Sequence, residues 1–175
     1  MVYTHYWAYQ PDSAHFTEIF PRLVADSRAI VARLAERGVP LGGPTGIGEP
    51  LLNDSIIAVN GTRPETGENF VLAPDSGSGL TAHNSAGERF RMDWCLTRRQ
   101  PYDLAVTAIL LRAAQVAPLH VSVASDGNWL HDWQDARLLL MELFDAYDHR
   151  GQLRPLAELS RGPEALHAPD LVHAA

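Results

Sequence analysis

The sequence predicts an α+β fold, with its elements in the order β-α-β-β-β-α-β-α. Three observations predict this class: long stretches with apolar residues at helical spacing, short stretches that alternate or are rich in β-branched residues, and a run of such strands in the middle of the chain. The order is close to a ferredoxin-like fold with an added strand and a final helix. Helices would cover one face of a mainly antiparallel sheet, and the other face would meet solvent, a ligand or a second subunit.

The N-terminal part predicts a strand followed by an amphipathic helix. Residues 2–9 alternate and are rich in β-branched and aromatic side chains, which is typical of a strand. Residues 17–37 carry apolar side chains at helical spacing, with Thr17 as the expected N-cap and Pro21 close enough to the first turn to be tolerated. One face of the first strand would carry Tyr3, His5, Trp7 and Tyr9.

The rest of the chain predicts strands at 55–60, 68–73, 88–95 and 119–124, and helices at 101–115 and 129–148. The helix at 101–115 is apolar nearly all round, so it is expected to be the most buried one. Residues 1–149 are expected to form a single domain. Residues 150–175 have no strong period and are expected to be a loosely packed tail.

The composition is that of an ordinary globular protein, with 46% hydrophobic and 20% charged residues. The net charge of -7 argues against binding to nucleic acid or to an anionic membrane. The single cysteine, Cys95, excludes an internal disulfide framework. No signal peptide is recognised, and the apolar stretch 104–117 is too short to span a bilayer, so a cytoplasmic location is expected.

Two junctions are the strongest candidates for a site. Residues 94–103 and residues 125–133 each read as a strand end that runs into a helix start. If both strands lie in one sheet, the two turns open at the same edge. Polar ligands collect at such edges in α/β architectures. We therefore expect a site where these two turns meet.

Cys95 is the first candidate for a reactive group. Arg98, Arg99 and a helix start follow it, and positive charge lowers the pKa of a thiol. His5 and His120 would lie on neighbouring strands and could act as bases. The alternative is a small buried apolar side chain, which is the commoner role of a lone cysteine.

Other candidate motifs favour structural roles. The glycine-rich loop at 42–48 follows a helix and leads into a strand, whereas a phosphate-binding loop follows a strand and opens a helix. The histidines do not have the spacing of metal ligands, so neither a metal nor a cofactor is expected. Asp126 belongs to a Ser-Asp-Gly turn and would either cap a helix or orient a ligand.

The aromatic side chains are numerous for a chain of this size. Stacked aromatic rings beside arginines would suit a planar anionic ligand such as a nucleobase, and Arg98 and Arg99 could hold a phosphate or carboxylate. Core packing or a subunit interface would explain the same aromatic residues. The expected ligand-binding residues are Tyr3, His5, Trp7, Arg91, Cys95, Thr97, Tyr102, Asp103, Ser125 and Asp126.

Five motifs together resemble a family of small proteins encoded by tailed bacteriophages and by actinobacterial and other bacterial genomes. They are the Tyr-Thr-His-Tyr-Trp start, the glycine loop around Gly46 and Gly48, Asn60-Gly61, the Cys-x-Thr-x-x-x-Pro-Tyr-Asp junction, and the Ser-Asp-Gly-x-Trp turn. The resemblance covers residues 1–147. It implies a shared fold and site position but no particular reaction. Its phage setting implies a role in countering host defence, for instance by sequestering a nucleotide signal.

Three functions follow from these observations. The first is a cytoplasmic binding protein for a small polar, nucleotide-like ligand, acting without a cofactor. The second is a small hydrolase or transferase that uses Cys95 or His5, with Asp103 or Asp126 orienting the partner. The third is a protein-interaction module or homo-oligomer that associates through an aromatic sheet face.

Overall fold

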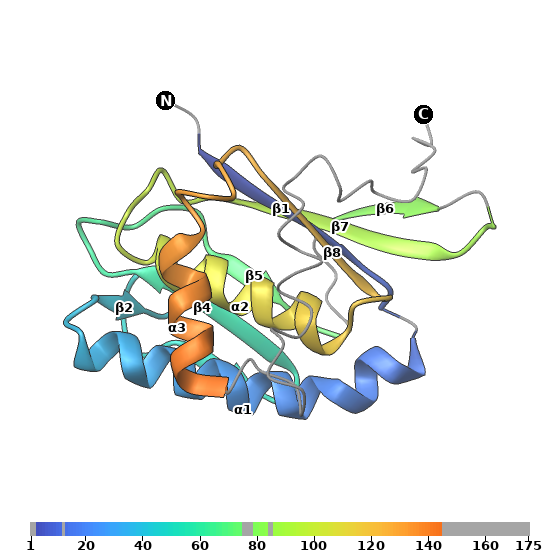
Figure 1. Ribbon diagram of the computed structural model, residues 1–175, viewed down its shortest axis with the longest axis horizontal. Helices are drawn as coiled ribbons and strands as arrows, with labels where there is room; N and C mark the ends of the chain where they lie inside the picture. The colour runs from blue at the N-terminus through green and yellow to red at the C-terminus, as the bar shows by residue number, and fades with distance from the viewer. Residues whose placement is uncertain (1–2, 12, 75–78, 84–85, 145–175) are drawn as a thin grey trace.

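The computed structural model describes residues 3–11, 13–74, 79–83 and 86–144 (Figure 1). In this part of the chain, three helices combine with two antiparallel sheets, which confirms the α+β class. The division of the strands between two sheets was not indicated by the sequence. The predicted tail at 150–175, and residues 145–148 of the last predicted helix, lie outside the described residues.

The first sheet has the strand order β6-β7-β1-β8, with all neighbours antiparallel. Its strands are β1 (Thr4–Tyr9), β6 (Leu80–His83), β7 (Arg89–Leu96) and β8 (Val121–Ser125). His5 pairs with Cys95 on one side and with Ser125 on the other. Both β7 and β8 therefore end beside the start of β1, so the two junctions do lie at one edge of one sheet.

The second sheet is built around β4, with β2, β3 and β5 as its partners. Its strands are β2 (Leu41–Gly42), β3 (Leu51–Asn53), β4 (Ile56–Gly61) and β5 (Phe70–Leu72). The sequence predicts β4 and β5. It misses β2, β3 and β6, because strands of two to four residues are too short to show alternation.

The first helix, α1 (Ala14–Glu36), begins earlier than predicted. Ser13 caps it, because the Ser13 hydroxyl accepts a hydrogen bond from the N–H of Phe16 at 3.3 Å. Thr17 is therefore not the N-cap, and Pro21 lies inside the helix rather than in its first turn. Two good capping residues stand close together in this segment, and the sequence pattern did not distinguish them.

The last helix, α3 (Gln134–Phe144), begins later than predicted. The side-chain carbonyl of Asn128 accepts hydrogen bonds from the N–H groups of Leu130 and His131, at 2.9 and 3.2 Å. These bonds hold the chain in a turn before the helix can start. The turn keeps residues 128–132 beside the end of β8.

The central helix α2 (Asp103–Val116) is the most buried of the three helices in the described residues, as predicted. Figure 1 shows the first sheet along the top of the molecule, α1 along the bottom, and α2 between them. The two sheets also meet directly, since the rings of Trp7 and Phe70 have centroids 5.0 Å apart. No helix in the described residues is long and apolar enough to cross a lipid bilayer.

The two faces of the first sheet differ in burial. The face with Tyr3, His5, Trp7 and Cys95 is turned toward the helices, and each of these residues is at most 2% exposed. Of the uses that the sequence left open for these aromatic residues, core packing is the one observed, because the helices and the second sheet cover that side. On the opposite face, which we call the open face, Tyr6 (39% exposed), Trp94 (45%) and Leu80 (61%) are exposed, whereas Thr4, Ala8, Ala82 and Phe90 are buried.

Candidate functional site

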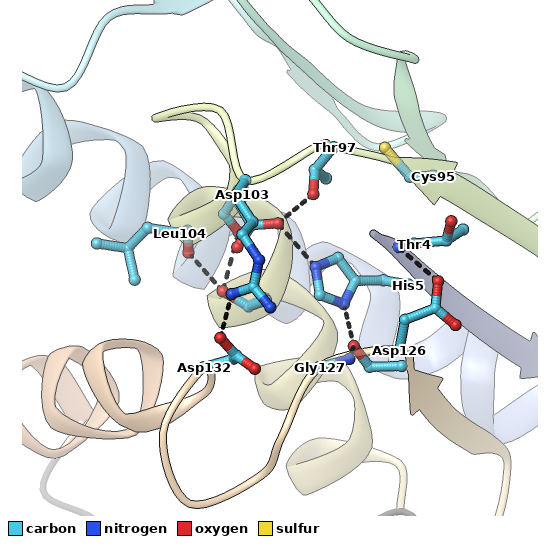
Figure 2. A network of polar contacts seen from close by, with 12 residues as sticks. Thr4, His5, Cys95, Thr97, Asp103, Leu104, Asp126, Gly127 and Asp132 are labelled. Atoms are coloured by element: carbon cyan, nitrogen blue, oxygen red, sulfur yellow. Dashed lines mark hydrogen bonds and ion pairs between the residues drawn. The ribbon is translucent and has the colours of Figure 1, made fainter. Parts of the chain in front are cut away.

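The site is centred on His5, which lies on β1 between β7 and β8. The imidazole Nε2 is 2.7 Å from Oδ1 of Asp103, and Nδ1 is 2.9 Å from the hydroxyl oxygen of Ser125. Figure 2 shows the ring between Asp103 and the turn that carries Gly127. A carboxylate can only accept a hydrogen bond, so Nε2 carries the proton of the neutral ring. The Nδ1 lone pair then accepts the proton of the Ser125 hydroxyl.

Aromatic neighbours fix the orientation of the imidazole ring. Tyr3 and Trp133 each meet it edge-on, with ring centroids at 5.0 and 5.3 Å and interplanar angles of 87° and 88°. The His5 side chain is completely buried. A buried imidazole with both nitrogens bonded and both sides packed has little freedom to rotate. His5 is therefore held in one orientation.

Asp103 reaches the site from the first turn of α2. Its Oδ1 also accepts a hydrogen bond from the hydroxyl of Thr97, the residue that directly follows β7. A carboxylate in the first turn interacts favourably with the positive end of the helix dipole. Asp103 thus joins the helix to two strands of the first sheet. We call Thr97, Asp103, His5 and Ser125 the His5 network.

Ser125 is the last residue of β8 and is only partly buried. Its hydroxyl oxygen accepts the N–H of Gly127 at 2.9 Å and also forms a hydrogen bond with the side chain of Tyr3. A Cβ at position 127 would lie 2.6 Å from the Tyr3 hydroxyl, so the close turn requires glycine there. Burial, followed by the charge of Asp103, raises the pKa of Tyr3 well above its usual value.

Asp126 points away from His5. Its carboxylate accepts the N–H of Thr4 at 3.0 Å and lies 3.5 Å from the hydroxyl of Tyr6. The backbone N–H of Asp126 donates to the carbonyl of Thr4 at 3.0 Å. Asp126 therefore fastens the turn after β8 to the start of β1, and it does not cap a helix, since α3 begins only at Gln134.

Cys95 lies buried in the core, where its thiol is hydrogen-bonded. Its thiol donates to the carbonyl of Glu68 at 3.2 Å and lies 4.0 Å from the hydroxyl of Tyr102. Burial raises the pKa of the thiol to about 12. The arginines that follow in sequence do not offset this effect, because Cys95 faces the core and Arg98 and Arg99 are exposed. Cys95 is the small buried side chain of the alternative interpretation.

Three further expected residues lie outside the His5 network. Trp7 is in the core against Phe70. Arg91 pairs with Tyr9, at the opposite end of β1 from His5. The fully buried Tyr102 donates a hydrogen bond to the carbonyl of Glu68 at 3.0 Å. The structure therefore brings together Tyr3, His5, Thr97, Asp103 and Ser125, and leaves Trp7, Arg91, Cys95, Tyr102 and Asp126 beside or away from them.

The glycine-rich loop is a tight internal turn. The N–H of Gly43 donates to the carbonyl of Gly48 at 3.0 Å, and the N–H of Gly46 donates to that of Gly43 at 2.8 Å. Asn60 closes the loop from β4 by donating to the carbonyl of Pro44 at 3.1 Å. These amides are used within the loop, which fits a connecting role. In the described chain, no group of three or more metal-binding side chains comes together.

Sequence reasoning missed the pairing of these residues rather than the residues themselves. His5, Asp103 and Ser125 were each candidates, but Ser125 was not considered as the partner of His5. The bonds join residues that are 98 and 120 positions apart, so only the register of β1 with its two neighbours reveals them. Trp133, which packs on the His5 ring, was not among the expected ligand-binding residues.

No protein-family model, no curated protein and no solved structure matches this chain.

Proposed function

We propose that this protein is a hydrolase or transferase in which Ser125 is the nucleophile, His5 is its general base and Asp103 orients His5. The observation that supports the proposal is the continuous hydrogen-bonded series from the Ser125 hydroxyl through the buried imidazole to the Asp103 carboxylate. A nucleophile bonded to a base that is itself oriented by a third group is the geometric signature of an activated serine. Such sets are identified by geometry and role, and they occur on unrelated folds.

The proposed reaction is acyl transfer. Nδ1 of His5 takes the proton of the Ser125 hydroxyl as its oxygen forms a bond to the carbonyl carbon of an ester-like substrate. The bond to the leaving group breaks, and the leaving group takes that proton from His5. Water, or a second acceptor in a transferase, then attacks the acyl-serine. Its proton passes through His5 back to Ser125, which restores the starting state.

Two features of the surroundings support this assignment. Asp103, which also accepts a hydrogen bond from Thr97, accepts the N–H of Nε2, and this leaves the lone pair of the neutral ring on the nitrogen that faces Ser125. The N–H of Gly127 points at the Ser125 hydroxyl oxygen and would stabilise negative charge on it. The nitrogens are used in the opposite order from the common serine-hydrolase arrangement, in which Nε2 faces the serine.

The proposal is tested by reaction with an alkyl fluorophosphonate. A nucleophilic serine forms a bond to phosphorus and releases fluoride, and intact mass spectrometry with peptide mapping identifies the labelled residue. We expect one label, on Ser125. Ser125→Ala should abolish it, and His5→Gln should slow it by 100-fold or more, the order of magnitude of general-base catalysis. Ser122→Ala is the matched control, because Ser122 lies on the same strand but on the opposite face.

The alternative use of the same residues is ligand binding without turnover. A folded protein that takes no label at Ser125 contradicts the nucleophile assignment. If thermal denaturation of that unlabelled protein shifts upward with nucleotides, the His5 network serves to shape a binding site, as the first function inferred from the sequence requires. If labelling of the His5→Gln variant equals that of the wild type, His5 is not the base.

The open face of the first sheet favours a second role, self-association with another copy of this chain. Each chain carries a net charge of -7, so two copies repel unless they meet through an uncharged surface. No charged side chain lies on this face of the four described strands, which carries Thr4, Tyr6, Ala8, Leu80, Ala82, Phe90, Met92, Trp94, Leu96, Ser122 and Ala124. Thr4, Ala8, Ala82 and Phe90 are already buried within the chain, so face-to-face packing of two such sheets would bury the exposed members of this face, which are Tyr6, Leu80, Trp94 and Ala124.

Sedimentation velocity tests the self-association. We expect a concentration-dependent dimer in the wild type and a monomer in Trp94→Glu. Leu138→Glu is the control, since Leu138 is a similarly exposed apolar side chain on α3, with 53% exposure against 45% for Trp94. A wild-type monomer at all concentrations, or equal behaviour of the two variants, contradicts this role.

A further inference from the structure

The turn that joins β7 to α2 has an unusual sequence for its backbone. The N–H of Gln100 donates to the carbonyl of Thr97 at 3.0 Å, which closes a four-residue turn. Its two central residues, Arg98 and Arg99, have φ angles of 54° and 59°. Two successive left-handed residues are the pattern of a type I′ turn, which usually contains Asn and Gly. Here the two positions instead carry long cationic side chains, and left-handed residues of this kind cluster at functional sites.

Arg99 is fixed beside the His5 network. Its guanidinium carbon lies 3.9 Å from the centroid of the Tyr3 ring, and its Nη1 donates to the carboxylate of Asp132. The other contacts of Tyr3 are with the His5 ring and the Ser125 side chain. One aromatic ring therefore separates this cation from the proposed nucleophile and base. The Arg99 side chain remains 51% exposed, so one side of the guanidinium faces solvent.

The backbone of Arg98 is hydrogen-bonded to the chain, whereas its side chain is exposed to solvent. The N–H of Arg98 donates to the carbonyl of Tyr3 at 3.3 Å. This bond lies on the β7 side of the start of β1, whereas the bond from Asp126 to Thr4 lies on the β8 side. Arg98 is exposed, and its guanidinium forms no ion pair within the described part of the chain. In a chain of net charge -7, an unpaired arginine next to a paired one forms a local positive patch.

We propose that the Arg98–Arg99 turn binds an anionic group, a carboxylate or a phosphate, on the substrate that Ser125 attacks. This inference rests on the proposed function. A guanidinium fork binds either group through two parallel hydrogen bonds, and Asp132 already shows a carboxylate held by Arg99. Arg98 supplies the second, free fork.

The spacing of the strands limits the size of the substrate. The turn continues β7, and Ser125 ends β8, with β1 between them. Two strand spacings, about 10 Å, separate Ser125 from the backbone of Cys95, and Arg98 lies farther along, beside Tyr3. The arginine side chain can reach back over much of that distance. The substrate is therefore a small molecule whose acid group and reacting carbonyl are separated by a few bonds, such as a dicarboxylic half-ester.

Two aryl esters that differ in one charge test the inference. 4-Nitrophenyl acetate is neutral, and 4-nitrophenyl hemisuccinate carries a carboxylate; release of 4-nitrophenol measures kcat/KM for both. We expect the anionic ester to be preferred at least 10-fold at low salt, and the preference to fall as salt is added. Arg98→Asn should remove most of the preference while retaining activity on the acetate, since asparagine tolerates the left-handed turn. Arg98→Lys keeps the positive charge but loses the forked guanidinium, and it should retain only part of the preference for the anionic ester.

The control and a binding measurement separate this inference from the proposed function. Arg22→Gln removes an exposed arginine of α1 and should leave the preference unchanged. Hydrolysis of both esters without preference, or equal effects of Arg98→Asn and Arg22→Gln, overturns the anion site and leaves the nucleophile assignment intact. If neither ester reacts, titration with phenyl phosphate decides. Saturable NMR shifts at residues 98–100 that Arg98→Asn abolishes support the anion site without catalysis, and their absence overturns it.

Discussion

Replacement of Asp103 by alanine tests the arrangement of the His5 network through stability alone. The change removes the acceptor for two buried donors, Nε2 of His5 and the hydroxyl of Thr97, both of which are fully buried. Each buried donor left without a partner costs about 1–3 kcal/mol, and loss of the charge at the helix start adds about 0.5 kcal/mol. The Asp103 side chain is 17% exposed, so water can reach the gap and reduce this cost.

We therefore expect Asp103→Ala to lower the free energy of unfolding by about 2–4 kcal/mol. With a urea m-value of about 2 kcal/mol/M, the midpoint should fall by about 1–2 M with m unchanged. Asp103→Asn keeps one acceptor and should cost about half as much.

Asp135→Ala is the matched control for this prediction. Asp135 is an exposed acid in the first turn of α3, so its removal affects only the helix dipole, a loss of about 0.3–1 kcal/mol. If Asp103→Ala costs no more than Asp135→Ala, the two buried donors do not depend on Asp103, and the arrangement described for the site is incorrect.

Three further predictions concern the surroundings of the site. Cys95 should react with a disulfide reagent at pH 8 only after unfolding in urea, and rapid reaction of the native protein would contradict its burial. Burial raises the pKa of the Cys95 thiol to about 12 from 9.0, so the thiol of the unfolded chain ionises at lower pH than that of the folded chain. The free energy of unfolding should therefore fall above pH 9 by up to about 1.4 kcal/mol per pH unit. Urea denaturation of Cys95→Ser between pH 9 and 10 should show a flatter pH dependence, and a dependence identical to that of the wild type would refute the role of Cys95. Gly67→Ala places a Cβ against the hydroxyl of the buried Tyr102 and should destabilise the protein by about 1–3 kcal/mol, whereas Gly38→Asn, in open space at a φ of 75°, should change the urea midpoint little; equal midpoints for the two variants would contradict the close packing.

The sequence predicts those parts of the fold that have a long and regular pattern. The helices α1 and α2 and the strands β1, β7 and β8 appear close to their expected bounds, because their patterns extend over five residues or more. Helix ends were less accurate, since hydrogen bonds from Ser13 and Asn128 decide them and several nearby residues had the same capping ability. Very short strands carry no period and were not predicted.

The meeting of the two junctions at one sheet edge was predictable, but the hydrogen bonds between their residues were not. Alternation along β1 separates its residues into two faces, yet both faces are aromatic, so the sequence did not reveal that the helices cover His5 rather than Tyr6. The partners of His5 follow from a register that pairs it with Cys95 and Ser125 at once. Local pattern contains no information on such pairing between distant segments.

The central position of β1 has a consequence for folding. The two strands that pair with β1 come much later in the sequence, since His5 pairs with Cys95 in β7 and with Ser125 in β8. Contacts between segments so far apart close large loops, and proteins rich in such contacts fold slowly. During synthesis, β1 leaves the ribosome long before β7 and β8 exist, with both of its edges unpaired. The interval before β8 emerges is therefore when this chain is most exposed to aggregation, and a chaperone that shields the first strand would act there.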